Sequence, residues 1–256
     1  EDCIITIPSM MHTRFSIRAC MIHPSEITVV MQGDIRSETA LAVRSVRSLL
    51  PNARLILSTF NTEDIGAIAG EVDDVVLSDD PGAMPSFIKA DILPTNNINR
   101  QLTTSKAGLD RVHTTYAVKM RTDCVLHNAE FVGLLERFSI GDANPDRLVV
   151  SSFFTRHPYG LACYLFHISD WFVCGRSDRV RQFFSAPLML LDDATWFERH
   201  ESLKSGTYAA RRFRARFTPE QHITTHFAHV LGYRIPDYLN HWSARLAREY
   251  EDFLAN

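Results

Sequence analysis

Tyr116-Ala-Val-Lys-Met-Arg-Thr-Asp123 is the most informative stretch of this 256-residue chain. Apolar residues alternate along it, which is the pattern of a strand with one face in a hydrophobic core. An acidic residue follows the strand directly. Open α/β sheets bind their ligands at the carboxyl ends of their strands, so Asp123 is the first candidate for a functional residue.

Similar segments precede this strand and alternate with helical patterns. Strands are predicted at residues 27–31, 54–59 and 75–77, and helices at 38–50 and 97–112. This alternation is typical of a mostly parallel sheet with right-handed crossovers. We therefore predict an α/β fold, a Rossmann-type, mostly parallel sheet flanked by helices. The first strand and the Tyr116 strand should be neighbours, with Gln32 and Gly33 across a crevice from Asp123.

The second half of the chain is less regular and more helical. The patterns predict a strand at 148–154, a strand or strand pair at 166–174, and helices over 178–184, 219–232 and 241–254. Thr218-Pro-Glu-Gln221 is a strong helix start, with a threonine cap, proline at the first position and glutamine three residues after the cap. We therefore expect a helical C-terminal part.

The composition narrows the class of protein. A net charge of −3 gives no general attraction to nucleic acid, and five scattered cysteines indicate a reducing compartment rather than a disulfide framework. No apolar run approaches the ~20 residues that span a bilayer, and no signal peptide is evident. We expect a cytoplasmic globular protein. Because the chain begins with Glu1, residues 1–25 are expected to be an N-terminal extension, such as the remnant of a longer chain.

Asp123 is a candidate metal ligand. Arg121-Thr-Asp123 looks like the Asp-x-Asp motif of nucleotide-sugar glycosyltransferases with its first acid replaced by arginine. Carboxylate oxygens suit Mn²⁺ or Mg²⁺, which bridge phosphates and would neutralise a diphosphate leaving group. Arg121 would share that neutralisation. The alternative for Asp123 is a structural role, as the cap of a turn after the strand.

Several polar residues are candidates for binding a donor nucleotide. Gly33 lets the backbone approach a ligand, and Gln32 offers a donor and an acceptor to a base or ribose. Asp79 can accept hydrogen bonds from ribose hydroxyls, although Asp-Pro-Gly after it is also good turn chemistry. Asn97 and Arg100 lie in the first turn of a helix, a position that favours a phosphate. Turn geometry and a solvated helix face are the structural alternatives.

Acceptor binding and catalysis are expected in the second half. Trp171 could cover the apolar face of a sugar while Asp170 and His167 bind its hydroxyls, unless the aromatic residue is only part of the core. An inverting transfer needs a base for the acceptor hydroxyl, and Glu220 or Asp170 could serve. A retaining transfer gives the base no such role. Acids at the start of a helix, such as Glu220, are also common as capping residues.

Eight stretches resemble the WavE family of lipopolysaccharide-synthesis proteins. They are Val29-Val-Met-Gln-Gly33, Leu57-Ser-Thr59, Val76-Leu-Ser-Asp-Asp-Pro-Gly82, Asn96-Asn-Ile-Asn-Arg-Gln101, Lys119-Met-Arg-Thr-Asp123, Ser151-Ser-Phe-Phe-Thr155, His167-Ile-Ser-Asp-Trp-Phe172 and Pro219-Glu-Gln221. The resemblance implies a GT-A-like glycosyltransferase that moves a sugar from a nucleotide donor, most simply a UDP-sugar, to a growing lipopolysaccharide or capsule. The acceptor would be a glycan or lipid-linked glycan, which would suit peripheral association with the inner face of the bacterial inner membrane.

The resemblance also implies a domain plan. Residues 26–256 would form a single GT-A-like domain, with a nucleotide-sugar half at 26–125 and an acceptor half at 126–256. Two other classes remain open from the residues. One is a nucleotidyltransferase, for which Gln32-Gly-Asp-Ile-Arg36 is a poor phosphate loop. The other is a glycan- or nucleotide-binding module without turnover, because the first acid of the metal motif is missing.

Overall fold

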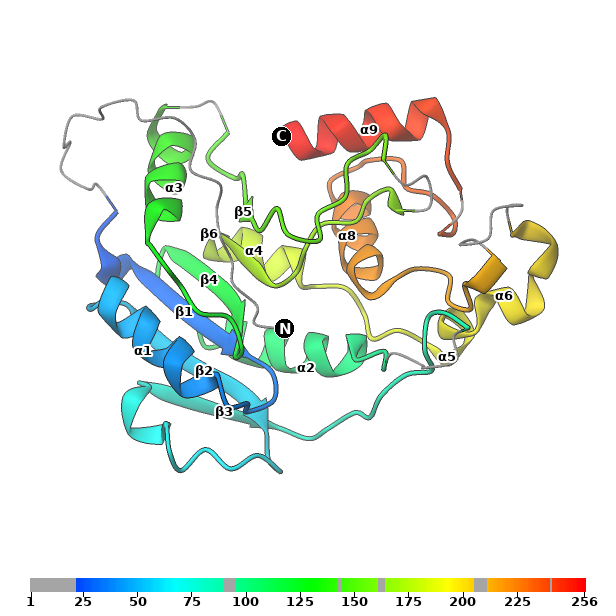
Figure 1. Cartoon of the computed structure of the whole chain (residues 1–256). Coiled ribbons are helices and arrows are strands. Elements are labelled where there is room, and N and C mark those ends of the chain that lie inside the picture. The colour runs from blue at the N-terminus through cyan, green and yellow to red at the C-terminus, as the bar shows by residue number, and fades with distance from the viewer. Residues whose placement is uncertain (1–21, 90–94, 142–143, 161–163, 205–210, 240) are drawn as a thin grey trace. The chain divides into compact units, whose positions relative to one another are not determined.

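The computed structural model describes residues 22–89, 95–141, 144–160, 164–204, 211–239 and 241–256 (Figure 1). Most of the predicted N-terminal extension, residues 1–21, lies outside the described residues. Chain contacts divide the protein into two compact units. Unit 1 consists of Glu1–Asp79, Thr104–Phe153 and Asp170–Arg181, and unit 2 of Asp80–Thr103, Phe154–Ser169 and Gln182–Asn256.

Unit 1 is built on a sheet with the strand order β3-β2-β1-β4-β6-β5. Its strands are β1 (Ile27–Gln32), β2 (Arg54–Phe60), β3 (Asp74–Ser78), β4 (Tyr116–Arg121), β5 (Val149–Val150) and β6 (Phe172–Arg176). The first four strands are parallel, and β6 runs antiparallel to both β4 and β5. The predicted α/β class with a mostly parallel sheet is confirmed, and so is the pairing of β1 with β4.

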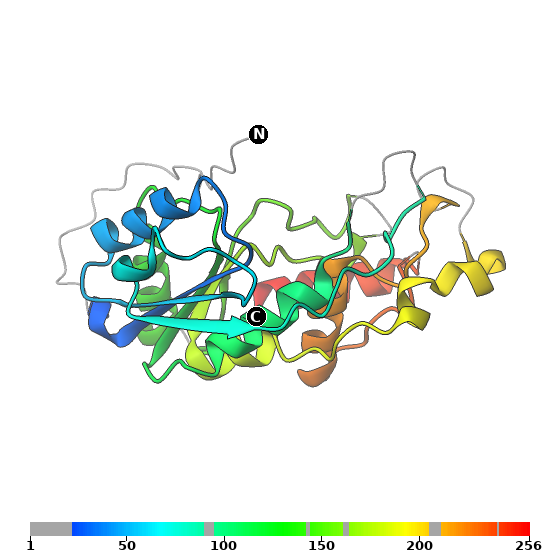
Figure 2. The same cartoon turned by 90° about the horizontal axis from the view of Figure 1, so that it is seen from below.

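Helices cover both faces of this sheet. The first face packs against α1 (Thr39–Leu49) and α3 (Glu130–Gly141) in one hydrophobic cluster that includes Met31, Leu57 and Met120. On the other face, α2 (Ile98–Leu109) places Gly108 against Val30 and Ser58. The helix α4 (Ser177–Phe183) lies on the side of the strands opposite α1 (Figure 2).

Some predicted elements differ from the structure, and the strand predicted at 148–154 comprises only Val149–Val150. Residues 166–171 do not form a strand, and β6 begins only at Phe172. The helix α3 was not predicted, although its residues Phe131, Val132 and Leu135 are buried in the core. The other long helices and the first four strands lie close to where the sequence places them.

Unit 2 contains the short helices α5 (Leu191–Ala194) and α6 (Trp196–Arg199) and the longer helices α8 (Pro219–Val230) and α9 (Ala244–Ala255). The predicted capping box of α8 is confirmed, because Gln221 N donates to Thr218 Oγ1 and Thr218 N to Gln221 Oε1, each at 3.2 Å. No helix among the described residues is long and apolar enough to cross a membrane.

Gly108 should be far more sensitive to a methyl group than Gly133. A Cβ at Gly108 would lie 2.5 Å from Val30 Cγ1 and 2.8 Å from Ser58 Cβ, whereas a Cβ at Gly133 in α3 would meet no atom within 4 Å. We expect Gly108→Ala to lower the free energy of unfolding by about 1–3 kcal/mol through overpacking. Gly133→Ala should raise it by about 0.5–1 kcal/mol through helix propensity. Urea unfolding of both variants measures the difference, and equal effects would contradict the packing of α2 on the sheet.

Candidate functional site at the carboxyl edge of the sheet

The ends of β1 and β4 meet at a tight backbone junction. Thr122 N donates to the Gln32 carbonyl at 3.0 Å, and Gly33 N donates to the Ser58 carbonyl at 3.1 Å. Gly33 has φ +125°, and a Cβ there would lie 3.3 Å from Thr122 Oγ1. Glycine is required because the left-handed backbone and the close approach both exclude a larger residue.

Gln32 carries a buried acceptor that no described residue satisfies. Its side chain is on the same sheet face as that of its register partner Arg121. Gln32 is only 6% exposed, and its Oε1 has no hydrogen-bond partner among the residues that the structure describes. A buried polar atom without a partner costs about 1–3 kcal/mol. A ligand N–H or O–H group would satisfy it.

Two arginines converge on the Asp123 carboxylate. Arg121 donates from Nε to Oδ1 at 2.8 Å and from Nη2 to Oδ2 at 2.5 Å. Arg36 Nη1 lies 2.9 Å from Oδ2. Burial alone would raise the pKa of Asp123, but the hydrogen bonds and charge of Arg121, together with the charge of Arg36, hold that pKa below its usual value. The carboxylate is therefore ionised at neutral pH.

An aromatic side chain fixes one of these arginines. The Arg121 guanidinium lies 4.3 Å from the ring centroid of Trp171. In addition, the backbone N–H of Arg121 donates to the backbone carbonyl of Trp171 at 3.2 Å. Phe153 packs edge-on against the same ring at 5.2 Å between centroids. Burial lowers the pKa of Arg121, but the bonded Asp123 outweighs burial and raises it. Trp171 therefore serves as a platform for a guanidinium.

The buried side chain of Lys119 holds the backbone of the segment that precedes β6. It is fully buried in β4, and its Nζ donates to the Asp170 carbonyl at 2.7 Å. Burial lowers the pKa of Lys119 to about 8, although the nearby Asp170 raises it in part. Asp170 is itself buried, directly before Trp171. Lys119 thus ties the segment that precedes β6 to the edge where β1 and β4 end.

The residues at this edge do not fit a divalent cation. Both oxygens of Asp123 already accept hydrogen bonds from guanidinium groups, and cationic side chains surround it. Within the described part of the chain, no group of three or more His, Cys, Asp or Glu side chains could hold a metal ion. Mn²⁺ and Mg²⁺ need several oxygen ligands from the protein or substrate. We derive no chemical step through a metal ion.

Unit 2 brings Asn97 and Arg100 together with Asp80. Arg100 donates from Nε and Nη2 to the two oxygens of Asp80 at 2.7 and 2.6 Å, and from Nη1 to Asn97 Oδ1 at 3.1 Å. The hydrogen bond from Arg100 is the main reason that the pKa of Asp80 is lowered. The predicted candidate Asp79 instead belongs to unit 1 and accepts from Asn61 Nδ2 at 2.6 Å.

A second pair in unit 2 joins two other candidates. His167 Nε2 lies 3.4 Å from Glu220 Oε2, and His167 Nδ1 is buried with no hydrogen-bond partner among the described residues. Burial would raise the pKa of Glu220, but His167 outweighs it and lowers the pKa, helped by Arg156. The Tyr250 hydroxyl donates to the His167 carbonyl at 2.9 Å, which fixes the histidine against α9.

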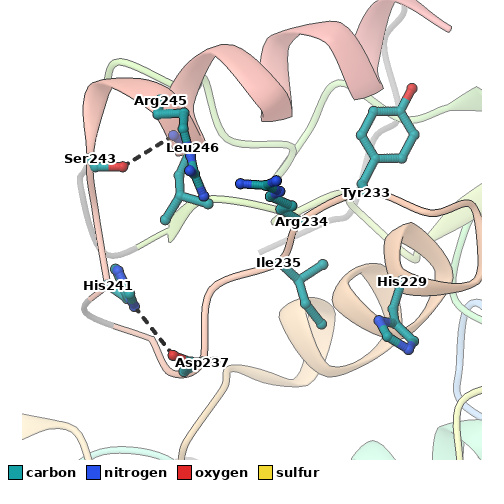
Figure 3. A pocket seen from close by; sticks show the side chains of 9 residues that line it. All are labelled: His229, Tyr233, Arg234, Ile235, Asp237, His241, Ser243, Arg245 and Leu246. Atoms are coloured by element: carbon teal, nitrogen blue, oxygen red, sulfur yellow. Dashed lines mark hydrogen bonds and ion pairs between the residues drawn. The ribbon is translucent and has the colours of Figure 1, made fainter.

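A pocket of about 710 Å³ lies elsewhere in unit 2 (Figure 3). Most of its lining residues come from the segment between α8 and α9: His229, Tyr233, Arg234, Ile235, Asp237, His241, Ser243, Arg245 and Leu246. Ser243 Oγ accepts from Leu246 N at 3.2 Å and caps α9. None of the residues predicted to bind donor or acceptor lines this pocket.

The structure therefore sorts the predicted residues other than Asp79 into three groups. Gln32, Gly33, Arg121, Asp123, Asp170 and Trp171 share one edge of unit 1; Asn97 joins Arg100; and His167 joins Glu220. Sequence reasoning missed Arg36, Lys119 and Arg156. The only available signal for Arg36 was its position three residues after Gly33, where a turn can lead the chain back to the edge.

The fold and this edge define an α/β protein with a candidate ligand site of arginines and an unsatisfied glutamine at the carboxyl ends of its parallel strands. A family model described as WavE lipopolysaccharide synthesis matches residues 27–256. The chain belongs to this family, and the resemblance found in the sequence is confirmed.

The solved structures that resemble this chain include the galactosyltransferase LgtC in complex with donor and acceptor sugar analogues. That match has a TM-score of 0.40 and 12% sequence identity, and it covers 78% of this chain and 69% of LgtC. No curated protein sequence matches this chain.

Proposed function

We propose that this protein is a glycosyltransferase of lipopolysaccharide synthesis that uses a nucleoside-diphosphate sugar, most simply a UDP-sugar, as its donor. Membership of the WavE lipopolysaccharide synthesis family supports the biological process. The site at the carboxyl edge of the sheet supports the donor class, because open α/β sheets bind nucleotides there. The proposed acceptor is a glycan or a lipid-linked glycan.

The observation that carries this proposal is the pairing of an unsatisfied amide with a cationic cluster. Gln32 Oε1 is buried without a partner among the described residues, and Gln32 is the register neighbour of Arg121, whose partner Asp123 also pairs with Arg36. A sugar nucleotide has hydrogen-bond donors on its base and ribose and negative charge on its diphosphate. Gln32 would take one of the donors, and the arginines would take the phosphates. Asp79, Asn97 and Arg100 are proposed as further donor-binding residues.

On the donor side, the reaction mainly needs positive charge that stabilises the leaving diphosphate. The bond between the anomeric carbon and the phosphate oxygen breaks, and its electron pair stays on the nucleoside diphosphate, where cationic groups stabilise it. A new bond forms between the anomeric carbon and the acceptor oxygen. The acceptor hydroxyl loses its proton to a carboxylate, for which Glu220 is our first candidate and Asp170 the second.

The proposed division of the chain follows from these roles. We propose that residues 26–125 bind mainly the donor and 126–256 mainly the acceptor, with His167 and Trp171 on the acceptor side. Peripheral membrane association would fit a lipid-linked acceptor. The arginines at 212, 214 and 216 do not argue for it, because they bind Lys89 O, Glu198 and Asp193 within unit 2.

Thermal shift tests the proposed donor class. The protein is heated with UDP, GDP, CDP and ADP, with UDP-sugars, and with the matching nucleosides as controls. A ligand at a hundred times its dissociation constant should stabilise the protein by about 2.7 kcal/mol. We expect one nucleoside diphosphate and its sugar nucleotides to raise the melting temperature more than the nucleoside does. If no nucleotide in the panel raises it, the proposal is wrong.

A further inference from the structure

We propose that Arg36 and Arg121 bind the donor diphosphate directly, without a divalent metal ion, and that Asp123 holds the two arginines in place until the donor arrives. This inference rests on the proposed donor class and specifies how that donor is bound. It replaces the role that the sequence suggested for Asp123, that of a metal ligand.

The hydrogen bonds of Asp123 are the first argument. Arg121 occupies both carboxylate oxygens with its planar fork, and Arg36 shares Oδ2. A cation that bound Asp123 would have to displace both guanidinium groups and then remain beside them. Like charges at such short range repel each other strongly in a partly buried site. Binding of Mn²⁺ or Mg²⁺ at Asp123 is therefore opposed by the groups already present.

Charge balance is the second argument. Two guanidinium groups share a single carboxylate, so this cluster has an excess of one positive charge, and the charges of the nearby buried Lys119 and Asp170 offset each other. A guanidinium binds two phosphate oxygens through parallel N–H groups, as it does those of a carboxylate. A diphosphate can therefore take the place that Asp123 holds in the free protein.

The two arginines differ in exposure and in the contacts that fix them, which suggests how the exchange proceeds. The Arg36 side chain is 49% exposed and lies on the loop after Gly33, so it can turn from Asp123 to a ligand at small cost. The Arg121 side chain is 28% exposed and is fixed by the Trp171 ring and by Asp123. Arg121 would thus be preorganised for the phosphate, and Arg36 would close over it. Preorganisation lowers the entropy cost of binding.

Isothermal titration with UDP, GDP, CDP and ADP tests the inference, in buffer with EDTA and in buffer with Mn²⁺. The nucleoside diphosphate that binds should have the same dissociation constant within about threefold under both conditions. Arg36→Gln and Arg121→Lys should each weaken it at least tenfold and leave binding of the nucleoside unchanged. Arg44→Gln is the matched control, because Arg44 lies on α1, pairs with Glu71 and takes no part in the site.

Asp123→Asn separates the two roles of the carboxylate. If Asp123 only occupies the arginines until the donor arrives, the variant removes a competing negative charge while Trp171 still stacks on Arg121, and the diphosphate should bind in EDTA as tightly as before or more tightly. If Asp123 binds a metal ion, the variant should lose affinity together with any effect of Mn²⁺. Arg36→Gln provides a second test. Because the Arg36 side chain is half exposed, this substitution should leave the protein folded.

The outcomes also separate this inference from the proposed function. A nucleoside diphosphate that binds only in the presence of Mn²⁺ would overturn the inference and leave the glycosyltransferase proposal intact. Unchanged affinity in Arg36→Gln and Arg121→Lys would overturn it as well. Failure of all four nucleoside diphosphates to bind in either buffer would overturn the proposed function, and this inference with it.

Discussion

Glu220→Gln is expected to lower turnover about 10²–10⁴-fold, which is the usual contribution of a general base. The substitution keeps the size and shape of the side chain but removes its negative charge and its ability to take a proton. His167 lowers the pKa of Glu220, so the carboxylate is ionised at neutral pH and is able to accept a proton. Release of nucleoside diphosphate from the sugar nucleotide, with a lipopolysaccharide fraction as acceptor, measures turnover.

Two measurements test whether Glu220 has only a structural role. Donor affinity, measured by titration, should stay within threefold of the wild type, and the variant should stay folded with a loss of about 1–3 kcal/mol, because the contact with the buried His167 is weakened. Glu251→Gln is the matched control, because Glu251 lies on α9 and binds the exposed Tyr159 hydroxyl. Turnover of Glu220→Gln within threefold of the control would show that Glu220 is only a capping residue.

The sheet could be predicted because its strands carry local signals. Alternation in Tyr116–Arg121 and the β-branched run in Ile27–Gln32 each define a strand, and the rules for parallel sheets make the two neighbours. Phe166-His-Ile-Ser169 also alternates apolar and polar residues, but residues 166–171 make different contacts. There Ile168 N donates to Thr224 Oγ1, and the His167 carbonyl accepts from Tyr250. These tertiary hydrogen bonds replace a strand ladder, and no local pattern encodes them.

The unpredicted helix α3 shows a different limit. Its start is marked only by Asn128, whose Oδ1 accepts from Glu130 N at 3.2 Å, and it contains Gly133, a poor helix former. Phe131 and Leu135 nevertheless stabilise it by packing on the sheet. Burial that depends on the whole fold therefore outweighed weak helix propensity.

The candidate site could be predicted only where it follows strand ends. Gln32, Gly33 and Asp123 come directly after β1 and β4, so topology alone brings them to one edge. Arg36 reaches that edge through a loop, which Thr122 Oγ1 holds by donating to the Asp34 carbonyl at 2.6 Å. The pair of His167 and Glu220 joins residues far apart in the sequence. Such contacts depend on tertiary structure, and a single sequence does not encode their distance.

Lys119→Met should change how stability depends on pH. The ordinary pKa of lysine is 10.5, and burial lowers that of Lys119 to about 8 in the folded protein. Below pH 8 the folded protein therefore contains a buried charge, and this cost disappears as the pH rises from 8 to 10.5. A shift of this size corresponds to about 3 kcal/mol. The stability of Lys119→Met relative to wild type should thus be highest below pH 8 and should fall by about that amount towards pH 10.5.

Urea unfolding of both proteins between pH 7 and 10.5 measures this difference. Burial raises the pKa of Cys174 and of Tyr250, which lowers stability in alkaline solution, but both residues are present in both proteins and cancel in the comparison. A difference that is constant with pH would mean that Lys119 does not titrate in this range. Lys119 destabilises the core below pH 8, yet it donates to the Asp170 carbonyl beside Trp171 and Arg121. We therefore expect Lys119→Met to bind the nucleoside diphosphate more weakly than wild type, even at pH values at which the variant is the more stable protein. A buried cation that lowers stability is typical of a functional site.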